Sequence, residues 1–221
     1  MERLVADTWT NPPPHCEHRH PRSPLPTQTS SDVTKLLRNV HPDVLARFYG
    51  CGSPIPPLMR GMVVLDLGCG TGRDSYVLSQ LVGPEGTVIG VDMTSEQLTV
   101  AQDTQLWHAA KFGFEKPNTR FVRGDISNLA AAGISDASVD VVVSNCVLNL
   151  VADKAAVFRE IARILKPGGE LYFSDVYADR RIPSALQRDK VLWGEVRAVV
   201  GGIVAVLQAT RVPSVNSCCS A

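Results

Sequence analysis

The sequence has no excess of charge of either sign, because 22 Lys and Arg residues balance 22 Asp and Glu residues. Proteins that bind nucleic acid or acidic membranes usually carry a basic excess, so this balance argues against both partners. A long apolar run is also absent: the longest, AVVGGIVAVL at 198–207, is about half of the ~20 residues that span a bilayer. The start, MERLVADTWTNPPPHCEHRH, lacks the apolar core of a secretory signal. We expect a cytoplasmic protein.

The cysteines do not form the pattern of a disulfide framework. Six are present, four alone and two adjacent, at positions 16, 51, 69, 146, 218 and 219. In a reducing cytoplasm such cysteines are expected to be free thiols. The segment HCEHRH at 15–20 lacks the spacing of a zinc finger, so we interpret it as a solvated polar tract.

The length of 221 residues suits one domain with tails. Residues 1–30 are rich in proline, serine and histidine, and are expected to form a disordered leader. From Ser31, apolar residues recur at helical spacing, which predicts a helix kinked at Pro42. We therefore divide the chain into a leader (1–30), a helix and connector (31–60), a main domain (61–195) and a divergent tail (196–221).

Strands and helices alternate through the main domain. After a first strand in MVVLDLGCGTGRD, strands are predicted at 87–92, 119–125, 139–145 and 168–175, and helices at 94–112 and 153–165. This alternation is typical of an α/β fold, a Rossmann-like parallel sheet with helices on both faces. The carboxyl ends of such strands share one edge, where ligands bind.

A glycine-rich turn follows the first strand. Gly68, Gly70 and Gly72 are spaced G-x-G-x-G, which differs from the G-x-G-x-x-G fingerprint of dinucleotide-binding proteins. Asp66, two residues before the first glycine, would repel a pyrophosphate. A carboxylate there suits a ligand with an ammonium, a sulfonium and no phosphate. S-adenosylmethionine fits this description.

Further carboxylates follow the next two strands. Asp92 could accept both ribose hydroxyls of the cofactor, and Asp125 with Ile126 could hold the adenine. Each acid taken alone could equally be a turn or helix cap. Their occurrence at successive strand ends favours a cofactor site. The predicted cofactor-binding residues are Asp66, Gly68, Gly70, Gly72, Asp92, Met93, Asp125, Ile126 and Asn145.

The chain resembles class I S-adenosylmethionine methyltransferases over residues 61–175. Over 36–195 it more closely resembles arsenite methyltransferase, through YGCG (49–52), VLSQLVG (77–83), VVVSNCVLNLV (141–151), LKPGGELYFSDVY (165–177) and KVLWGE (190–195). The resemblance implies a class I methyltransferase fold and trivalent arsenic as substrate. It also implies a thiol reductant such as glutathione or thioredoxin, and cysteine thiolates as arsenic ligands.

Cys51 and Cys146 are the candidate catalytic and arsenic-binding residues. Soft thiolates prefer soft metalloid centres, which agrees with the resemblance. Taken alone, Cys146 could equally be a small buried apolar residue, and Cys69 is expected to fill a gap in the glycine turn. Two alternatives remain: a methyltransferase for a small organic nucleophile, and a non-catalytic binder of the cofactor or arsenic.

The sequence departs from the family pattern near its C-terminus. Val196 follows WGE where the resemblance calls for a thiol, and upstream of the first helix only Cys16 is available. The fold normally adds a sixth and an antiparallel seventh strand, so we expect an incomplete set of C-terminal strands. GGIVAVLQ at 201–208 could supply one edge strand. We expect a chain that holds arsenic but methylates it poorly.

Overall fold

The structure is a computed structural model that describes residues 30–48, 52–57, 59–176 and 204–211. Its centre is a six-stranded sheet with the order β3-β2-β1-β4-β5-β6. The first five strands are parallel, and β6 pairs antiparallel with β5. The strands are β1 (Val63–Leu67), β2 (Thr87–Asp92), β3 (Thr119–Arg123), β4 (Val139–Asn145), β5 (Leu165–Val176) and β6 (Val204–Arg211).

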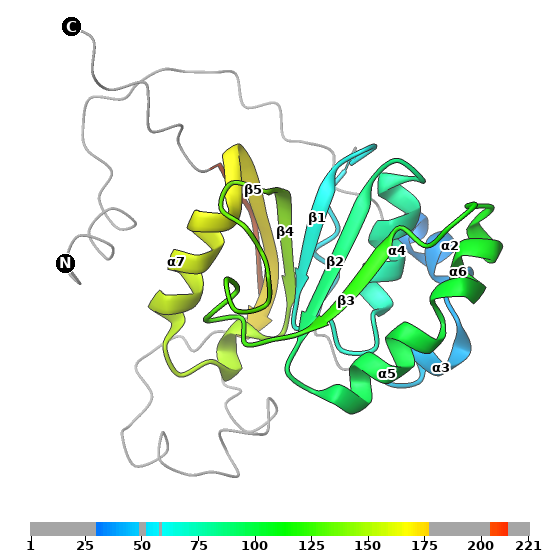
Figure 1. Ribbon diagram of the computed structural model, residues 1–221, viewed down its shortest axis with the longest axis horizontal. Coiled ribbons are helices and arrows are strands. Elements are labelled where there is room, and N and C mark those ends of the chain that lie inside the picture. The colour runs from blue at the N-terminus through cyan, green and yellow to red at the C-terminus, as the bar shows by residue number, and fades with distance from the viewer. Residues whose placement is uncertain (1–29, 49–51, 58, 177–203, 212–221) are drawn as a thin grey trace, which may run out of the picture.

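Helices cover both faces of this sheet (Figure 1). One face carries α7, and the other carries α4 with the shorter helices around it. The helices are α2 (Ser30–Leu37), α3 (Pro42–Leu45), α4 (Arg73–Val82), α5 (Ser95–Asp103), α6 (Gln105–Phe112) and α7 (Lys154–Ile164), with a short η1 at Leu148–Leu150. The predicted Rossmann-like α/β fold is confirmed for the described residues.

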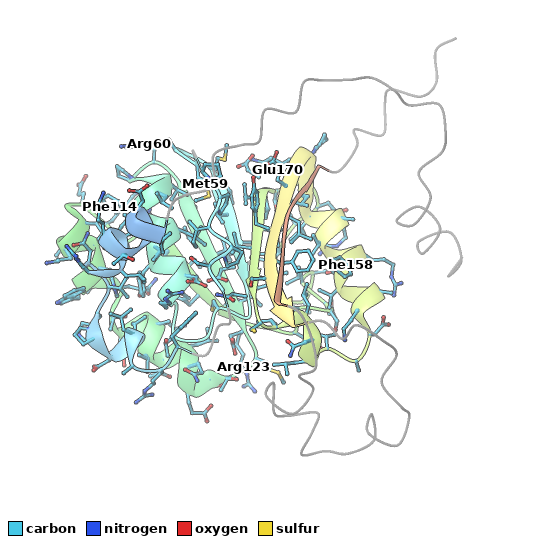
Figure 2. All side chains as sticks on the ribbon, turned by 180° about the vertical axis from the view of Figure 1, so that it is seen from behind. Met59, Arg60, Phe114, Arg123, Phe158 and Glu170 are labelled. Carbon is cyan, nitrogen blue, oxygen red and sulfur yellow. The ribbon has the colours of Figure 1, made fainter. Side chains whose placement is uncertain are left out.

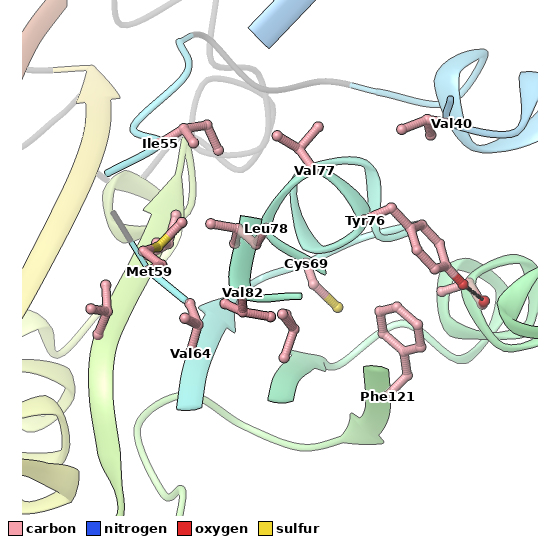
Figure 3. Close-up of a cluster of buried hydrophobic side chains, with 14 of the residues drawn as sticks. Val40, Ile55, Met59, Val64, Cys69, Tyr76, Val77, Leu78, Val82 and Phe121 are labelled. Carbon is pink, nitrogen blue, oxygen red and sulfur yellow. Dashed lines mark hydrogen bonds between the residues drawn. The ribbon is translucent and has the colours of Figure 1, made fainter. Parts of the chain in front are cut away.

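Two apolar cores result, one on each face, because successive side chains of a strand point to opposite faces. Val64, Tyr76 and Val77 belong to the core on the α4 face (Figure 3), whereas Leu65 and Ile161 belong to the core on the α7 face. Figure 2 shows Phe114 and Phe158 on opposite sides of the molecule. It places Arg123 at the carboxyl edge of the sheet, with Met59, Arg60 and Glu170 at the opposite edge.

Two predicted helices and the start of one predicted strand differ from the structure. The helix expected to kink at Pro42 is two helices, since Pro42 begins α3 as its first residue and cannot donate within a continuing α2. The helix predicted at 94–112 is interrupted at Thr104, between α5 and α6. The helix predicted at 153–165 agrees with α7, but the strand predicted to begin at 168 begins at Leu165.

The tail contributes one strand. β6 lies at the edge of the sheet beside β5, so the predicted edge strand is confirmed in type, and its range of 204–211 overlaps the predicted 201–208. Of the two C-terminal strands normal for the fold, the described residues contain this antiparallel one. Residues 1–29 of the predicted leader (1–30) lie outside the described residues, and Ser30 is the first residue of α2. None of the helices in the described ranges is long and apolar enough to cross a membrane.

Candidate functional site

A cavity of about 600 Å³ lies at the carboxyl edge of the sheet. Its lining comes from the glycine turn, the ends of β2 and β4, and the segments that follow β3 and η1. Most predicted site residues line it: Asp66, Gly68, Gly70, Asp92, Met93, Asp125, Ile126, Asn145 and Cys146. Gly72 is outside the lining, because it is the N-cap of α4 and packs against Phe121 and Tyr76. Cys51 lies outside the described residues.

The glycine turn is held by left-handed backbone conformations that favour glycine. Gly68 has φ of 69° and Gly70 has φ of 54°. A Cβ added to Gly68 would lie 2.3 Å from the Val147 side chain, so this glycine permits close packing against the segment after β4. A Cβ on Gly70 would meet nothing within 4 Å. Gly70 therefore leaves open space beside the cavity, as a ligand cradle requires.

Asp66 is buried at the end of β1 and accepts a hydrogen bond from Ser75 Oγ at 2.5 Å. Burial and, to a smaller extent, the nearby Asp74 carboxylate together raise the pKa of Asp66 to about 7, although the Ser75 hydrogen bond opposes the change. The carboxyl group can therefore take up or release a proton near neutral pH. A cationic ligand in the cavity would favour the ionised form.

Asp92 and Asp125 both bind local backbone. Asp92 accepts from the N–H groups of Gly70 (2.9 Å) and Thr94 (2.8 Å), so it ties the glycine turn to the end of β2. Asp125 accepts from both the backbone N–H and the hydroxyl of Ser127, which lowers the pKa of Asp125. Each acid therefore stabilises a local turn, which is the alternative role that the sequence analysis left open. Each carboxylate also lines the cavity.

Cys146 follows β4 directly and adopts the left-handed region, with φ of 60°. Such a conformation is uncommon for a residue with a side chain and is concentrated at functional sites. Its N–H donates to Ser174 O at 2.7 Å, which holds the sharp turn against β5. Cys146 is disulfide-bonded, so the expectation that every cysteine is a free thiol is wrong for this residue. The pairing removes the thiolate until the bond is reduced.

Cys69, within the glycine turn, is a free and buried thiol. It packs into the core on the α4 face (Figure 3), and burial together with Asp66 and Asp92 raises its pKa well above the ordinary range. A thiol that resists ionisation is a poor metalloid ligand. The expectation that Cys69 fills space is confirmed.

Asn145 contacts the connector that precedes the main domain. Its Nδ2 donates to Gly52 O at 2.9 Å and to Asp74 Oδ2 at 2.8 Å, and its Oδ1 accepts from Gly52 N at 3.1 Å. These contacts engage both ends of the side-chain amide. A cofactor that bound to Asn145, as predicted, would have to compete with these hydrogen bonds.

Several lining residues are absent from the sequence prediction. They include Arg47, Phe48, Arg73, Asp74 and Gln97. Gln97 Oε1 is buried without a hydrogen-bond partner among the described residues, which leaves it available to a ligand. Arg73 and Asp74 could have been predicted as lining residues, because they are a charged pair directly after the glycine turn. Gln97 sits in an ordinary helix, and nothing in its sequence context distinguishes it.

Sequence comparison identifies related methyltransferases. A family model for a methyltransferase domain matches residues 58–213. Arsenite methyltransferase from Aquipseudomonas alcaligenes is 59% identical over 160 residues, covering 72% of this chain and 46% of that protein. The human arsenite methyltransferase is 52% identical over 163 residues, covering 74% and 44%. The chain thus spans less than half the length of these relatives.

A solved structure also matches. The crystal structure of an arsenic(III) S-adenosylmethionine methyltransferase from Chlamydomonas reinhardtii has a TM-score of 0.72 and 49% identity. The match covers 76% of this chain and 56% of that one. The strand order, the glycine turn and the family match agree. The chain therefore belongs to the methyltransferase-domain family and has the Rossmann-like fold of class I methyltransferases.

Proposed function

We propose that this chain binds S-adenosylmethionine and transfers its methyl group to trivalent arsenic held by Cys51 and Cys146. The observation that carries the proposal is the position of Cys146. It lies at the turn after β4, lines the same cavity as the glycine turn, and is followed by Val147, which packs against Gly68. A thiolate there would hold its substrate beside a bound cofactor.

The cavity suits the cofactor on its own chemistry. Asp66 and Asp92 offer negative charge at one end, Gly70 leaves a cradle free of side chains, and Gln97 offers an unpaired oxygen. Ile126 and Met93 supply apolar surface for an adenine ring. When bound, S-adenosylmethionine supplies an electrophilic methyl group. The remaining task of the protein is to hold a nucleophile in line with it.

Cysteine chemistry favours arsenic as that nucleophile. Thiolates bind soft metalloid centres where carboxylates do not, and three-coordinate arsenic keeps a lone pair. Because Cys146 is disulfide-bonded, it must be reduced before it binds arsenic. We therefore include a thiol reductant, such as glutathione or thioredoxin, among the partners, and a reducing compartment such as the cytoplasm as the location.

Turnover is expected to be slow. Val196 stands where the arsenite methyltransferase resemblance calls for a third thiol after WGE. Two thiolates can hold arsenic, but the third would orient its lone pair. Since correct positioning of reacting groups is worth up to ~7–11 kcal/mol of a barrier, a missing ligand reduces the rate more than the binding.

The test is transfer of labelled methyl from S-adenosylmethionine to arsenite in the presence of glutathione. The unmodified chain, Val196→Cys and Cys146→Ser are compared. We expect weak turnover, an increase with Val196→Cys and loss with Cys146→Ser. Robust turnover that survives Cys146→Ser would contradict the thiolate mechanism. Such a result would make Cys146 a packing residue.

A further inference from the structure

The side chain of Asn145 fastens the N-terminal connector to the end of β4. Its amide donates to the carbonyl of Gly52 and accepts from the N–H of the same residue, as a neighbouring strand would. Gly52 is covalently bonded to Cys51, and consecutive Cα atoms are about 3.8 Å apart. Asn145 is likewise bonded to Cys146. A single side chain therefore links the backbones beside both candidate arsenic ligands.

Asp74 holds the other side of this link. Besides accepting from Asn145, its carboxylate pairs with Arg73 at 2.7 Å, and the Arg73 guanidinium lies 3.8 Å from the centre of the Phe48 ring. Phe48 and Gly52 flank residues 49–51 of the connector. Both flanking residues are thus tied, through Arg73 and Asn145, to one carboxylate at the start of α4.

Burial strengthens this network. The side chains of Arg73 and Asp74 are 13% and 6% exposed, so water competes weakly for their hydrogen bonds. Charge-assisted bonds in such surroundings are shorter and stronger than neutral ones. Gly52 adds a steric condition, because a Cβ at that position would lie 2.1 Å from Ser174 Oγ and 2.8 Å from Ser174 Cβ. The connector is therefore hydrogen-bonded to Asn145 of β4 and packed against Ser174 of β5.

We propose that Asn145, braced by Asp74, is a positioning residue that fixes the backbone of Gly52, the residue after Cys51 in the sequence, against the end of β4 next to Cys146, and is not a cofactor contact. The proposal rests on the proposed use of these two cysteines.

The test measures dithiol binding and cofactor binding separately in the reduced full chain. Phenylarsine oxide, which bonds to two thiolates at once, reports the spacing of Cys51 and Cys146 when every protein compared carries Cys218→Ser and Cys219→Ser. Asn145→Ala is expected to weaken phenylarsine oxide binding about 10-fold or more, since the effective concentration of one thiol near the other falls. S-adenosylmethionine affinity, measured by calorimetry, should change by less than about 2-fold, as for an independent site.

Asn118→Ala is the matched control. The Asn118 amide also makes three hydrogen bonds, to Ser79 O, Gly83 O and the Ser79 hydroxyl, but at the amino end of β3. The Asn118→Ala variant should have a lower melting temperature but an unchanged phenylarsine oxide affinity. Equal phenylarsine oxide affinity in the two variants would overturn the proposal. Loss of cofactor affinity alone in Asn145→Ala would also overturn it.

If Asn145→Ala is too unstable to compare with the control, Gly52→Ala and its double variant with Ser174→Gly provide the test. Gly52→Ala leaves Asn145 intact but pushes the connector away from Ser174. It should weaken phenylarsine oxide binding, and adding Ser174→Gly should restore it. Failure of Gly52→Ala to weaken binding would overturn the proposal. If Cys146→Ser binds phenylarsine oxide as tightly as the unmodified chain, the proposed function itself fails, which is a separate result.

Discussion

The carboxyl group of Asp66 is buried and beside Asp74, and for these reasons its pKa is raised to about 7. The folded chain retains a proton there between about pH 4 and 7, whereas the unfolded chain releases it. The contribution of Asp66 to stability therefore falls as the pH rises through that range. A bound cation would recover the ionised form, so ligand binding and proton release are coupled at this residue.

This coupling predicts a pH dependence of cofactor affinity. Lowering the pH from 8 to 6 should weaken S-adenosylmethionine binding about 10-fold, because most of the Asp66 carboxylate becomes protonated. Asp66→Asn, which cannot ionise, should remove most of this dependence and should melt at a higher temperature than the unmodified chain at pH 8. Calorimetry and thermal melting provide the two measurements. The same pH profile in Asp66→Asn would assign the dependence to another group.

His108 is buried without charge. Its Nδ1 donates to Thr104 O at 2.8 Å, its Nε2 accepts from His41 N at 3.0 Å, and its ring stacks on Tyr76 at 3.4 Å between centroids. Burial lowers the pKa of His108 to about 4. The unfolded chain binds a proton at about pH 6.5, so the stabilising effect is complete above that pH and is lost as the pH falls toward 4.

The expected loss from His108 is up to about 3 kcal/mol of unfolding free energy between pH 6.5 and 4. Urea unfolding at pH 7, 5.5 and 4.5 measures it. His108→Gln removes the titrating group, so its stability should decline less steeply over this range than that of the unmodified chain. Parallel curves for the two proteins would show that other groups cause the acid sensitivity.

At the scale of elements, the glycine turn and the segment after β4 depend on each other. Gly68 requires both a left-handed backbone and space occupied by Val147. Gly61 has a similar φ of 72° but nothing within 4 Å of its added Cβ. Substituting Gly61 therefore tests backbone strain alone, whereas substituting Gly68 tests strain together with a steric clash.

Gly61→Ala should cost about 1–2 kcal/mol, from left-handed strain alone. Gly68→Ala should cost about 1–3 kcal/mol more, because the new methyl group collides with Val147. Val147→Ala should relieve part of this extra cost in the double variant. Chemical denaturation measures all four proteins. Equal costs for the two glycine substitutions would mean that Val147 does not confine the turn.

At the scale of the whole molecule, β6 forms one edge of the sheet and covers β5. It pairs antiparallel with β5, which would otherwise present unpaired backbone groups along the border. Removing residues 204–221 should therefore lower the melting temperature and promote self-association. Removing only 212–221 leaves the strand intact and serves as the control. Light scattering and melting curves should distinguish the two proteins, and identical behaviour would show that β6 does not protect the sheet.

Much of the fold was predictable because its signals are local. The apolar runs of β2 and β4 are bounded by polar residues, so the predicted ranges 87–92 and 139–145 agree with the structure. Asp153 was recognisable as a cap, and it accepts from Ala156 N as expected. The helix breaks near Pro42 and at Thr104 were less predictable, since the apolar spacing continues across both.

The sequence by itself determined the order of elements, the edge at which the strands end, and the carboxylates and thiol carried there. Covalent order and side-chain periodicity suffice for these features. Only the tertiary structure decided which residue each of these groups meets. Asp66 is buried beside Asp74, Asn145 bonds to Gly52, and Cys146 turns against Ser174. These partners are distant in the chain, and packing, not local propensity, brings them into contact.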